Sequence, residues 1–177
     1  MLVVRAARPA DADAVARIYS EGITERSATF ETEPRTAADV LAWMDAGERL
    51  PLLVADDDGR VLGWARILAY SDRSAYAGVG EVSLYVGRAA RRRGAGRRLL
   101  QEIERHAGEL GYWKLITLLF PENAASLALL RGSGWREVGL HLRHGRLEGE
   151  WRDVLMLERV IGDQAPAPDG GAASPGA

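Results

Sequence analysis

The sequence has no cysteine, no long apolar run and no excess of charge of one sign. Without cysteine, the chain cannot form disulfides, thiolate metal sites or a cysteine-acyl intermediate. No apolar run has the length of about 18 residues that a membrane span needs. The start, from Met1 to Arg5, lacks the basic region and apolar stretch of a signal peptide. We therefore expect a cytoplasmic protein that has no membrane partner.

The charges nearly balance, with 23 basic and 25 acidic residues and a net charge of -2. Nucleic-acid partners normally require a strong basic excess, so none is expected, although a local basic cluster could still bind a small anion. A length of 177 residues with 47% hydrophobic content suits one domain with a real core. Few apolar residues occur from residue 162 onward, so we predict a domain over 1–161 and a disordered tail over 162–177.

The spacing of apolar residues predicts a mixed α/β sheet with helices on both faces. An Asp-Gly pair at residues 58–59 predicts a hairpin turn, and Gly22 is expected to weaken the first helix. The expected strands span residues 2–6, 50–55, 61–68, 81–86, 115–120, 135–142 and 151–160. The expected helices span residues 11–21, 36–45, 94–110 and 124–131.

Arginines and glycines cluster where the strand ending at Val86 meets the helix that begins near Gly94. Glycine allows peptide N–H groups to approach a ligand, and a helix N-terminus adds unpaired donors with partial positive charge. Arginine adds forked donors that suit phosphate oxygens. Neither a P-loop nor a Gly-x-Gly-x-x-Gly dinucleotide motif is present. The pattern therefore indicates a pyrophosphate site of another kind; the alternative is a solvated basic helix start.

Arg91-x-x-Gly94-x-Gly96, following Leu84-Tyr85-Val86, resembles the acetyl-CoA signature of the GNAT acetyltransferase superfamily. Further segments resemble its phosphinothricin N-acetyltransferase branch. These are Arg8-Pro9-Ala10-x-x-Asp13, Ala28-Thr29-Phe30-Glu31-Thr32-Glu33-Pro34, Arg73-x-Ala75-Tyr76, Glu81-x-x-Leu84-Tyr85-Val86, Asn123-x-x-Ser126 and Gly149-x-Trp151-x-Asp153-Val154. The ordered series covers about residues 3 to 160, which makes the resemblance specific.

This resemblance implies a single GNAT-like domain with a mixed, mostly antiparallel sheet flanked by helices. It implies acetyl-CoA as the co-substrate and no metal. By position, the cofactor arm would contact Leu84, Tyr85, Val86, Asn123 and Ser126. The pyrophosphate would contact Arg91, Arg92, Arg93, Gly94, Ala95, Gly96 and Arg97. Asn123 also fits a plain helix N-cap, and the two roles are compatible.

Glu81 matches the catalytic glutamate of the phosphinothricin branch and is our candidate general base. Amines are mostly protonated at neutral pH, so a base beside the acceptor assists acetyl transfer. Apolar neighbours such as Val79 and Val82 could raise the pKa of Glu81 toward the working range. The alternative is an ordinary strand glutamate that faces solvent.

A covalent route has little support, because the chain lacks cysteine and a Gly-x-Ser-x-Gly elbow. His106, His141 and His144 show neither metal nor triad spacing. We therefore expect direct attack of the amine on acetyl-CoA. Many GNAT enzymes place a tyrosine after the asparagine as an acid, but residues 126–131 contain none.

The resemblance implies that Phe30, Arg73 and Tyr76 frame the acceptor pocket. A glutamate-like small-molecule amine such as phosphinothricin, methionine sulfoximine or arsinothricin would fit there. Phe30 could instead anchor a loop, and Arg73 could be a surface charge. Relatives of this kind form dimers, which implies a homodimer. The chain departs from the branch at Leu130 and over residues 145–149, where both the substrate and the dimer contacts are put in question.

Two other functions remain open at this point. A GNAT enzyme could acetylate a protein N-terminus or a lysine, and an open groove rather than a closed pocket would distinguish it. The chain could also be a non-catalytic acyl-CoA-binding module, or a nucleic-acid binder that uses the arginine cluster.

Overall fold

The computed structural model describes residues 1–162, most of which lie in helices and strands. The strands are β1 (Leu2–Ala6), β2 (Leu52–Asp57), β3 (Arg60–Ala69), β4 (Val79–Val86), β5 (Lys114–Leu119), β6 (Arg136–Leu147) and β7 (Glu150–Val160). The helices are α1 (Ala12–Glu25), α2 (Ala37–Met44), α3 (Ala95–Glu109) and α4 (Ala124–Arg131). Apart from Gly162, the tail predicted over 162–177 lies outside the described residues.

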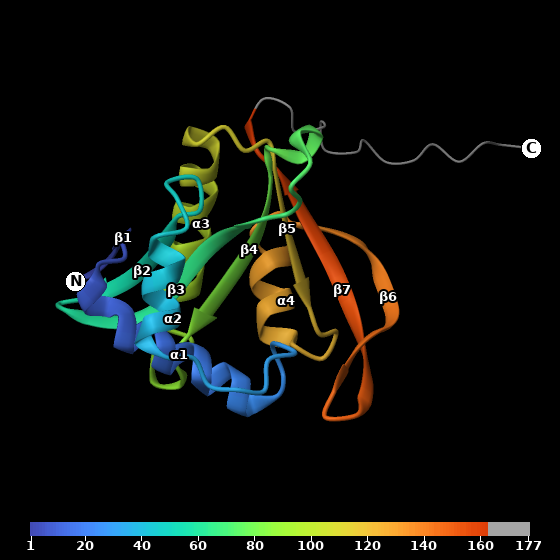
Figure 1. Ribbon diagram of the computed structural model, residues 1–177, viewed down its shortest axis with the longest axis horizontal. Helices are drawn as coiled ribbons and strands as arrows, with labels where there is room; N and C mark the ends of the chain where they lie inside the picture. The colour runs from blue at the N-terminus through green and yellow to red at the C-terminus, as the bar shows by residue number, and fades with distance from the viewer. Residues whose placement is uncertain (163–177) are drawn as a thin grey trace, which may run out of the picture.

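The strands form one sheet in the order β1-β2-β3-β4-β5-β7-β6 (Figure 1). Every neighbouring pair in this sheet is antiparallel except β4 and β5. The parallel pair is joined by α3, a crossover of the kind that such strands require. The prediction of an α/β domain with a mixed, mostly antiparallel sheet is therefore confirmed.

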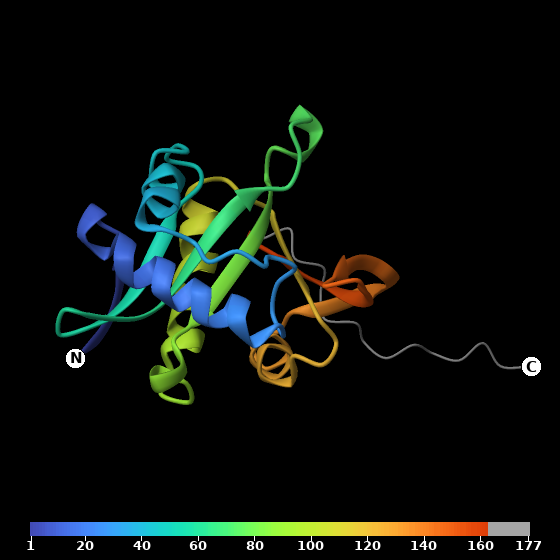
Figure 2. The same ribbon diagram turned by 60° about the horizontal axis from the view of Figure 1, so that its bottom comes forward.

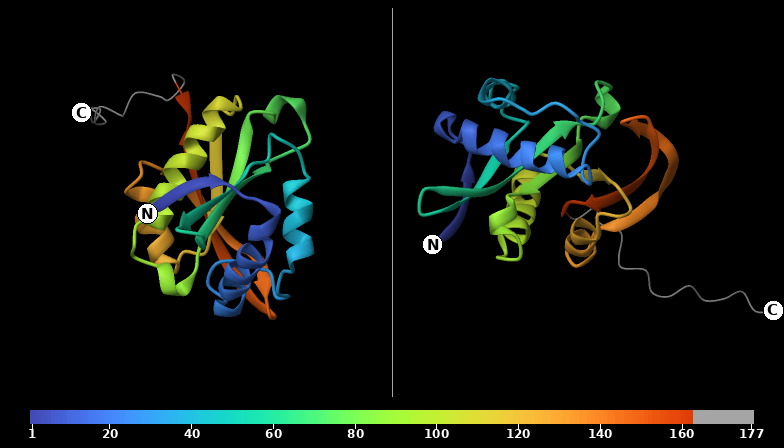
Figure 3. Two further views of the ribbon diagram at one scale, coloured as in Figure 1. Left: turned by 90° about the vertical axis from the view of Figure 1, so that its left-hand side faces the viewer. Right: turned by 90° about the horizontal axis from the view of Figure 1, so that it is seen from below.

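Helices cover both faces of the sheet (Figure 3, right), with α1 and α2 on one face and α3 and α4 on the other. On the first face, α1 contributes Val15 and Ile18 to a buried cluster around Trp64 of β3. On the second face, Leu99 and Ile103 of α3 pack against the sheet. Burial of these apolar stripes fixes the layers that flank the active-site region.

Helix α1 is longer than the sequence suggested, because it continues through Gly22 to Glu25. The expectation that the helix would end near residue 21, before Gly22, was wrong. An added Cβ on Gly22 would lie only 2.8 Å from the Tyr85 ring, so this glycine allows helix and strand to approach closely. The last turn of α1 thereby extends beside β4 (Figure 2).

Strands β4 and β5 separate soon after they pair. Their parallel register covers only Val79 to Glu81 against Lys114 to Ile116. Beyond this point the Thr117 hydroxyl donates to the Val82 carbonyl at 2.9 Å, and β5 continues alongside β7. Figure 1 shows the two strands spreading apart toward α4. The split leaves the edge of β4 without a neighbouring strand.

The β6–β7 hairpin also differs from expectation, because β6 continues to Leu147 instead of ending near residue 142. Glu148 and Gly149 form its tight turn, with φ of 51° and 88°. Leu147 is buried close to the turn. The segment that departs from the phosphinothricin branch is therefore the end of a hairpin, not a loop.

Candidate active site

A cavity of 1260 Å³ lies where β4 and β5 diverge. Its walls come from the end of α1, the loop after it, β3, β4, β5 and the first turns of α3 and α4. Most of the site residues expected from the sequence line it, namely Phe30, Glu81, Leu84, Tyr85, Val86, Arg91, Arg92, Gly94, Ala95, Gly96, Arg97, Asn123 and Ser126. The structure therefore brings the proposed cofactor residues and the candidate base into one continuous space.

The turn before α3 presents peptide N–H groups to one end of the cavity. Gly94 precedes the helix with φ of 84°, and Arg92 also has a positive φ, of 61°. No side chain caps this helix. The first N–H groups of a helix lack partners within it, so those of Ala95, Gly96 and Arg97 remain available at the positive end of its dipole. This arrangement is suited to bind an anion.

One carboxylate of α1 holds two arginines of the turn. Glu25 accepts from Arg88 at 2.6 Å and from Arg91 at 2.8 Å. Burial opposes ionisation of Glu25, but these two hydrogen bonds outweigh it and hold its pKa below the ordinary value. Arg91 is thus tied to α1, so its place beside the cavity is fixed partly by a structural contact.

The next arginines of the turn differ in where they lie. Arg92 and Arg97 are exposed, line the cavity and belong to no ion pair within residues 1–162. Arg93 is also exposed but is not among the lining residues. Arg92 and Arg97 are consequently better placed than Arg93 to meet phosphate oxygens.

The free edge of β4 offers peptide groups to an extended ligand. The Val82 carbonyl faces β5, since it accepts from Thr117. Peptide groups alternate in direction along a strand, so those of Leu84 and Val86 face the same gap. Those of Tyr85 face the opposite way, where Tyr85 pairs with Trp64 of β3. Backbone contacts to the cofactor arm are therefore expected from Leu84 and Val86 rather than from Tyr85.

Tyr85 contributes its side chain instead. Its ring stacks on Trp64 with 5.0 Å between centroids and meets Tyr19 edge-on at 4.7 Å. Its hydroxyl donates to the Ala28 carbonyl at 3.2 Å. Burial raises the pKa of Tyr85, so the hydroxyl stays protonated. Tyr85 thereby holds the loop after α1 against the cavity.

Asn123 lies at the start of α4 and lines the cavity. Its side-chain oxygen accepts from the Ser126 N–H at 3.2 Å, which is a helix N-cap. The amide nitrogen takes no part in this cap, so contact with the cofactor arm is compatible with the structural role.

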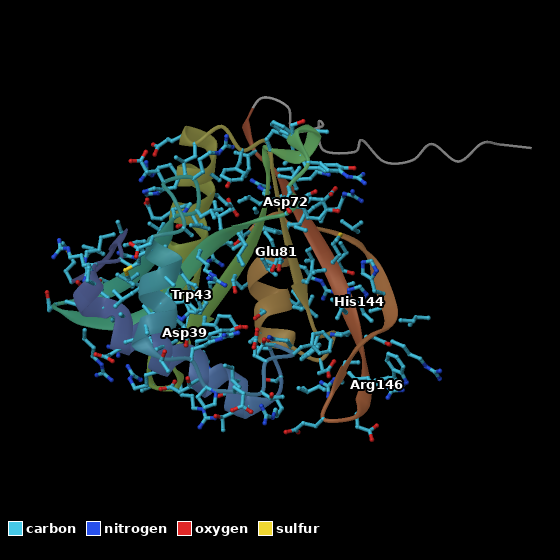
Figure 4. All side chains as sticks on the ribbon, viewed as in Figure 1. Asp39, Trp43, Asp72, Glu81, His144 and Arg146 are labelled. Carbon is cyan, nitrogen blue, oxygen red and sulfur yellow. The ribbon has the colours of Figure 1, made fainter. Side chains whose placement is uncertain are left out.

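Glu81 lies on β4 where β5 begins to diverge, and it is half-buried. Burial raises the pKa of its carboxyl group, while the positive charge of Arg66 partly lowers it. Figure 4 shows Glu81 in the central part of the sheet, between α2 and the β6 strand that carries His144. It is not a solvent-facing strand glutamate, and a carboxylate with a raised pKa inside a cavity suits proton transfer.

Phe30 lines the cavity and also packs edge-on against Phe120 at 4.9 Å between centroids. An added Cβ on Gly145 would lie 2.8 Å from its ring. The segment that departs from the phosphinothricin branch therefore packs on Phe30 at the hairpin end of the cavity, where His144 is also a lining residue. A contact of Phe30 with the acceptor stays a prediction.

Arg73 and Tyr76 lie in a different place from the rest of the set. They are in and beside a short 3₁₀ turn, Ser74–Tyr76, and neither is among the cavity-lining residues. Tyr76 is 40% exposed and packs edge-on against Tyr70. Because they do not line the cavity, their contact with the acceptor stays a prediction.

The family model for the Acetyltransferase (GNAT) family matches residues 15–135, more than half of the chain. The chain belongs to the GNAT family. It is an acetyl-CoA-dependent N-acetyltransferase, as the family and the cradle of helix N–H groups beside the open strand edge together indicate.

This GNAT enzyme is 36% identical over 162 residues to YwnH of Bacillus subtilis, covering 90% of this chain and 99% of the relative. A phosphinothricin acetyltransferase from Sinorhizobium meliloti, solved in complex with acetyl-CoA, has a TM-score of 0.86 at 30% identity. That match covers 98% of this chain and 96% of the other. A ribosomal-protein-alanine N-acetyltransferase from Brucella melitensis also has a TM-score of 0.86 at 30% identity, and the match covers 90% of this chain and 99% of the other.

Several lining residues of the GNAT cavity were not predicted from the sequence, among them Tyr19, Thr29, Arg66, Thr117 and His144. Arg66 had a signal, because it is a lone charge inside the apolar run from Val61 to Leu68. Such a charge is rare unless it is paired or functional. The other four carry no comparable signal.

Two further observations concern the described part of the GNAT enzyme. No group of three or more His, Asp or Glu side chains in residues 1–162 is arranged to hold a metal ion. None of the helices in that range is both long enough and apolar enough to cross a membrane.

Proposed function

We propose that this GNAT enzyme acetylates the amine of a small amino-acid-like acceptor, with Glu81 as the general base. The observation that carries the proposal is that a half-buried carboxylate and an anion-binding helix start line the same cavity. The acceptor class is supported by the similarity to the phosphinothricin acetyltransferase of Sinorhizobium meliloti. Phosphinothricin, methionine sulfoximine and arsinothricin are the candidate acceptors.

The residues at hand fit acetyl-CoA along the length of the cavity. The first turn of α3, with Arg92 and Arg97, would hold the pyrophosphate. The free edge of β4 would bind the arm as an added strand does, through the peptide groups of Leu84 and Val86. This path brings the thioester toward Glu81, which precedes Leu84 on the same strand.

Acetyl transfer then proceeds by direct attack. Glu81 accepts the proton of the acceptor amine, whose nitrogen forms a bond with the thioester carbon while the carbon–sulfur bond breaks. A peptide N–H on the open edge of β4 would donate to the thioester oxygen as negative charge develops. A free cysteine thiol has a pKa of about 8.5, and a thiol of this kind can depart as the thiolate. Helix α4 contains no tyrosine that could act as the acid.

A panel of acceptors tests the proposal directly. The enzyme would be mixed with acetyl-CoA and with phosphinothricin, methionine sulfoximine, free amino acids or a peptide bearing an N-terminal Ala or a Lys. Thiol release would give kcat/KM for each. We expect the highest value for an amino-acid-like acceptor. Tight acetyl-CoA binding without turnover of any acceptor would instead favour a non-catalytic acyl-CoA-binding module.

The second candidate function is acetylation of a protein N-terminus. It is favoured by the similarity to the ribosomal-protein-alanine N-acetyltransferase of Brucella melitensis. Phe30, packed on Phe120 at the acceptor end, argues for a smaller acceptor. A higher kcat/KM for the peptide than for every free amino acid in the panel would select this candidate instead.

Replacing Arg92 with Ala should weaken acetyl-CoA binding by about tenfold, since charge-assisted hydrogen bonds to phosphate are typically worth 1.5–3 kcal/mol and Arg92 is exposed. The affinity of Arg92→Ala for a pantetheine analogue that lacks the phosphates should be almost the same as that of the wild type. Calorimetry on both ligands measures the difference. Arg93→Ala is the matched control, because Arg93 does not line the cavity. Equal losses for the two ligands would remove the pyrophosphate contact from Arg92.

We further propose that the enzyme is a cytoplasmic homodimer. Support for self-association comes from the edge strand β6, where Val138, Leu140 and Leu142 are 45%, 49% and 72% exposed, and from Trp151 of β7, which is 50% exposed. Apolar side chains gathered on a sheet edge are commonly covered by a partner.

A further inference from the structure

Arg66 lies in the middle of β3, on the face of the sheet that carries Glu81. The antiparallel register places it opposite Ser83 of β4, with Glu81 two residues further along that strand. Diagonal neighbours of this kind are about 7–8 Å apart at their backbones, within the range of long side chains. Both Arg66 and Glu81 line the active-site cavity. The strand pairing thus brings a cation and the proposed base to the same part of the cavity.

The guanidinium of Arg66 forms no ion pair within residues 1–162, and its Nε is buried without a hydrogen bond. The Trp43 ring lies 3.8 Å from its central carbon. Trp43, labelled on α2 in Figure 4, fixes the position of the charge but does not neutralise it. A half-buried charge without an ion-pair partner is costly, and an anionic ligand would complete the site.

The groups around Arg66 supply little negative charge. Glu81 is the one carboxylate that acts on it, and the two charges interact only through space, with no hydrogen bond between them. Tyr19 of α1 and Tyr85 of β4 contribute hydroxyl groups, and burial raises the pKa of Tyr85 so that its hydroxyl stays protonated. Arg35, before α2, lies nearby, but its charge is paired with that of Glu31 at 2.6 Å, and Glu31 also lines the cavity. Arg66 is therefore the cation of this group that has no ion-pair partner within residues 1–162, which leaves it available to bind an anion.

We propose that Arg66 binds the α-carboxylate of an amino-acid acceptor while Glu81 meets the amine on the same carbon. This proposal rests on the function proposed above and adds the residue that selects an amino acid over a simple amine. A carboxylate matches the fork of a guanidinium, and an α-amino acid carries its amine and carboxylate one carbon apart. The remainder of the acceptor would extend toward Phe30 and His144, at the hairpin end of the cavity.

Binding at Arg66 would also prepare Glu81 for its task. The charge of Arg66 lowers the proton affinity of the Glu81 carboxylate. A bound carboxylate neutralises that charge, so Glu81 becomes a stronger base only when an amino acid is present. A simple amine would bind beside a weaker base.

Substrate discrimination tests the proposal. The substrates would be an accepted amino acid and its primary carboxamide, which keeps the amine and nearly the same size but loses the negative charge. Arg66→Met should lower kcat/KM for the acid by at least about tenfold, the loss expected for a charge-assisted hydrogen bond. The kcat/KM for the carboxamide should change by less than about threefold, and the affinity for acetyl-CoA should not change. Arg60→Met, on the exposed start of the same strand, should leave both substrates unaffected.

Equal losses for acid and carboxamide in Arg66→Met would overturn the role of Arg66 while leaving the transferase function intact. If the wild type acetylates no free amino acid, the proposed function fails. In that case, calorimetry of amino-acid binding to the CoA-bound protein tests the role of Arg66 by itself. Equal amino-acid affinity in the wild type and Arg66→Met would then overturn the proposed carboxylate contact.

Should Arg66→Met fail to fold, Arg66→Lys keeps the positive charge but lacks the forked guanidinium. If Arg66→Lys has the same ratio of kcat/KM for the acid to kcat/KM for the carboxamide as the wild type, recognition of the carboxylate by the guanidinium fork is ruled out.

Discussion

Replacing Glu81 with Gln is expected to lower kcat by about 10² or more while acetyl-CoA binds as before, which is the effect of losing a general base. The substitution keeps the shape of the side chain but removes its capacity to take a proton. Glu81 lies at the start of the free edge of β4, away from the cradle at α3, so the cofactor contacts should remain. Steady-state kinetics with an accepted acceptor, and calorimetry with acetyl-CoA, measure the two quantities separately.

The pH profile gives an independent readout of the same residue. Burial raises the pKa of Glu81, and the base acts only when ionised. The wild-type kcat should therefore fall as the pH drops through this raised value, and Glu81→Gln should lack that acidic limb. A kcat for Glu81→Gln equal to the wild type across pH 6 to 9 would remove Glu81 from the role.

Glu104 offers a matched control for this substitution. It is another partly buried glutamate whose pKa is raised by burial, but it lies on α3 and accepts a hydrogen bond from Trp135. It does not line the cavity. Glu104→Gln should leave both kcat and its pH dependence close to wild type, which separates catalysis from the general effect of removing a buried charge.

Stability should respond in the opposite direction to activity. A carboxyl group whose pKa is raised in the folded state contributes stability below its ordinary pKa, and this contribution is lost as the pH rises through the raised value. Ionised Glu81 therefore costs free energy at pH 8. Glu81→Gln should melt at or above the wild-type temperature there, so its loss of activity cannot be attributed to unfolding.

Local signals in the sequence were enough to predict the turn between β4 and α3. The helix start at Gly94 and the strand ending at Val86 are close together in the chain, so their spacing predicts where this turn lies. The strand β1 and the helix α4 were also predicted with the bounds that the structure shows. These features depend on short-range geometry, which a sequence pattern records directly.

The acceptor half depends on contacts between distant segments and was harder to predict. Arg66 approaches Glu81 only because β3 and β4 pair in one register, and a shift by one residue would turn Arg66 to the other face. The extension of α1 through Gly22 required knowledge of the Tyr85 ring that packs on it. Arg73 and Tyr76 were carried over by resemblance, and in this chain they do not line the cavity.

The second large effect is expected at Gly96, in the first turn of α3. A Cβ built there would lie 3.3 Å from a methyl group of Leu129, 3.5 Å from Val86 and 3.9 Å from Leu84, all of which line the cavity. A side chain at this position therefore points into the passage between the cradle and the edge of β4. Gly96→Phe should block the cofactor arm and raise the Kd of acetyl-CoA by about 10²-fold, or about 2.7 kcal/mol. Calorimetry measures the change.

Fragments of the cofactor separate obstruction of the arm from damage to the cradle. Adenosine 3′,5′-bisphosphate lacks the arm, so its affinity should fall far less than that of acetyl-CoA in Gly96→Phe. This is the reverse of the pattern expected for Arg92→Ala, in which the phosphate contacts are lost. Gly96→Ala should lower the affinity for acetyl-CoA only a few-fold, because the flexible end of the Leu129 side chain can move aside. Gly108→Ala, near the other end of the helix, should change neither affinity. Equal weakening of both ligands by Gly96→Phe would mean that the helix start itself had shifted, and the arm would then need another path to Glu81.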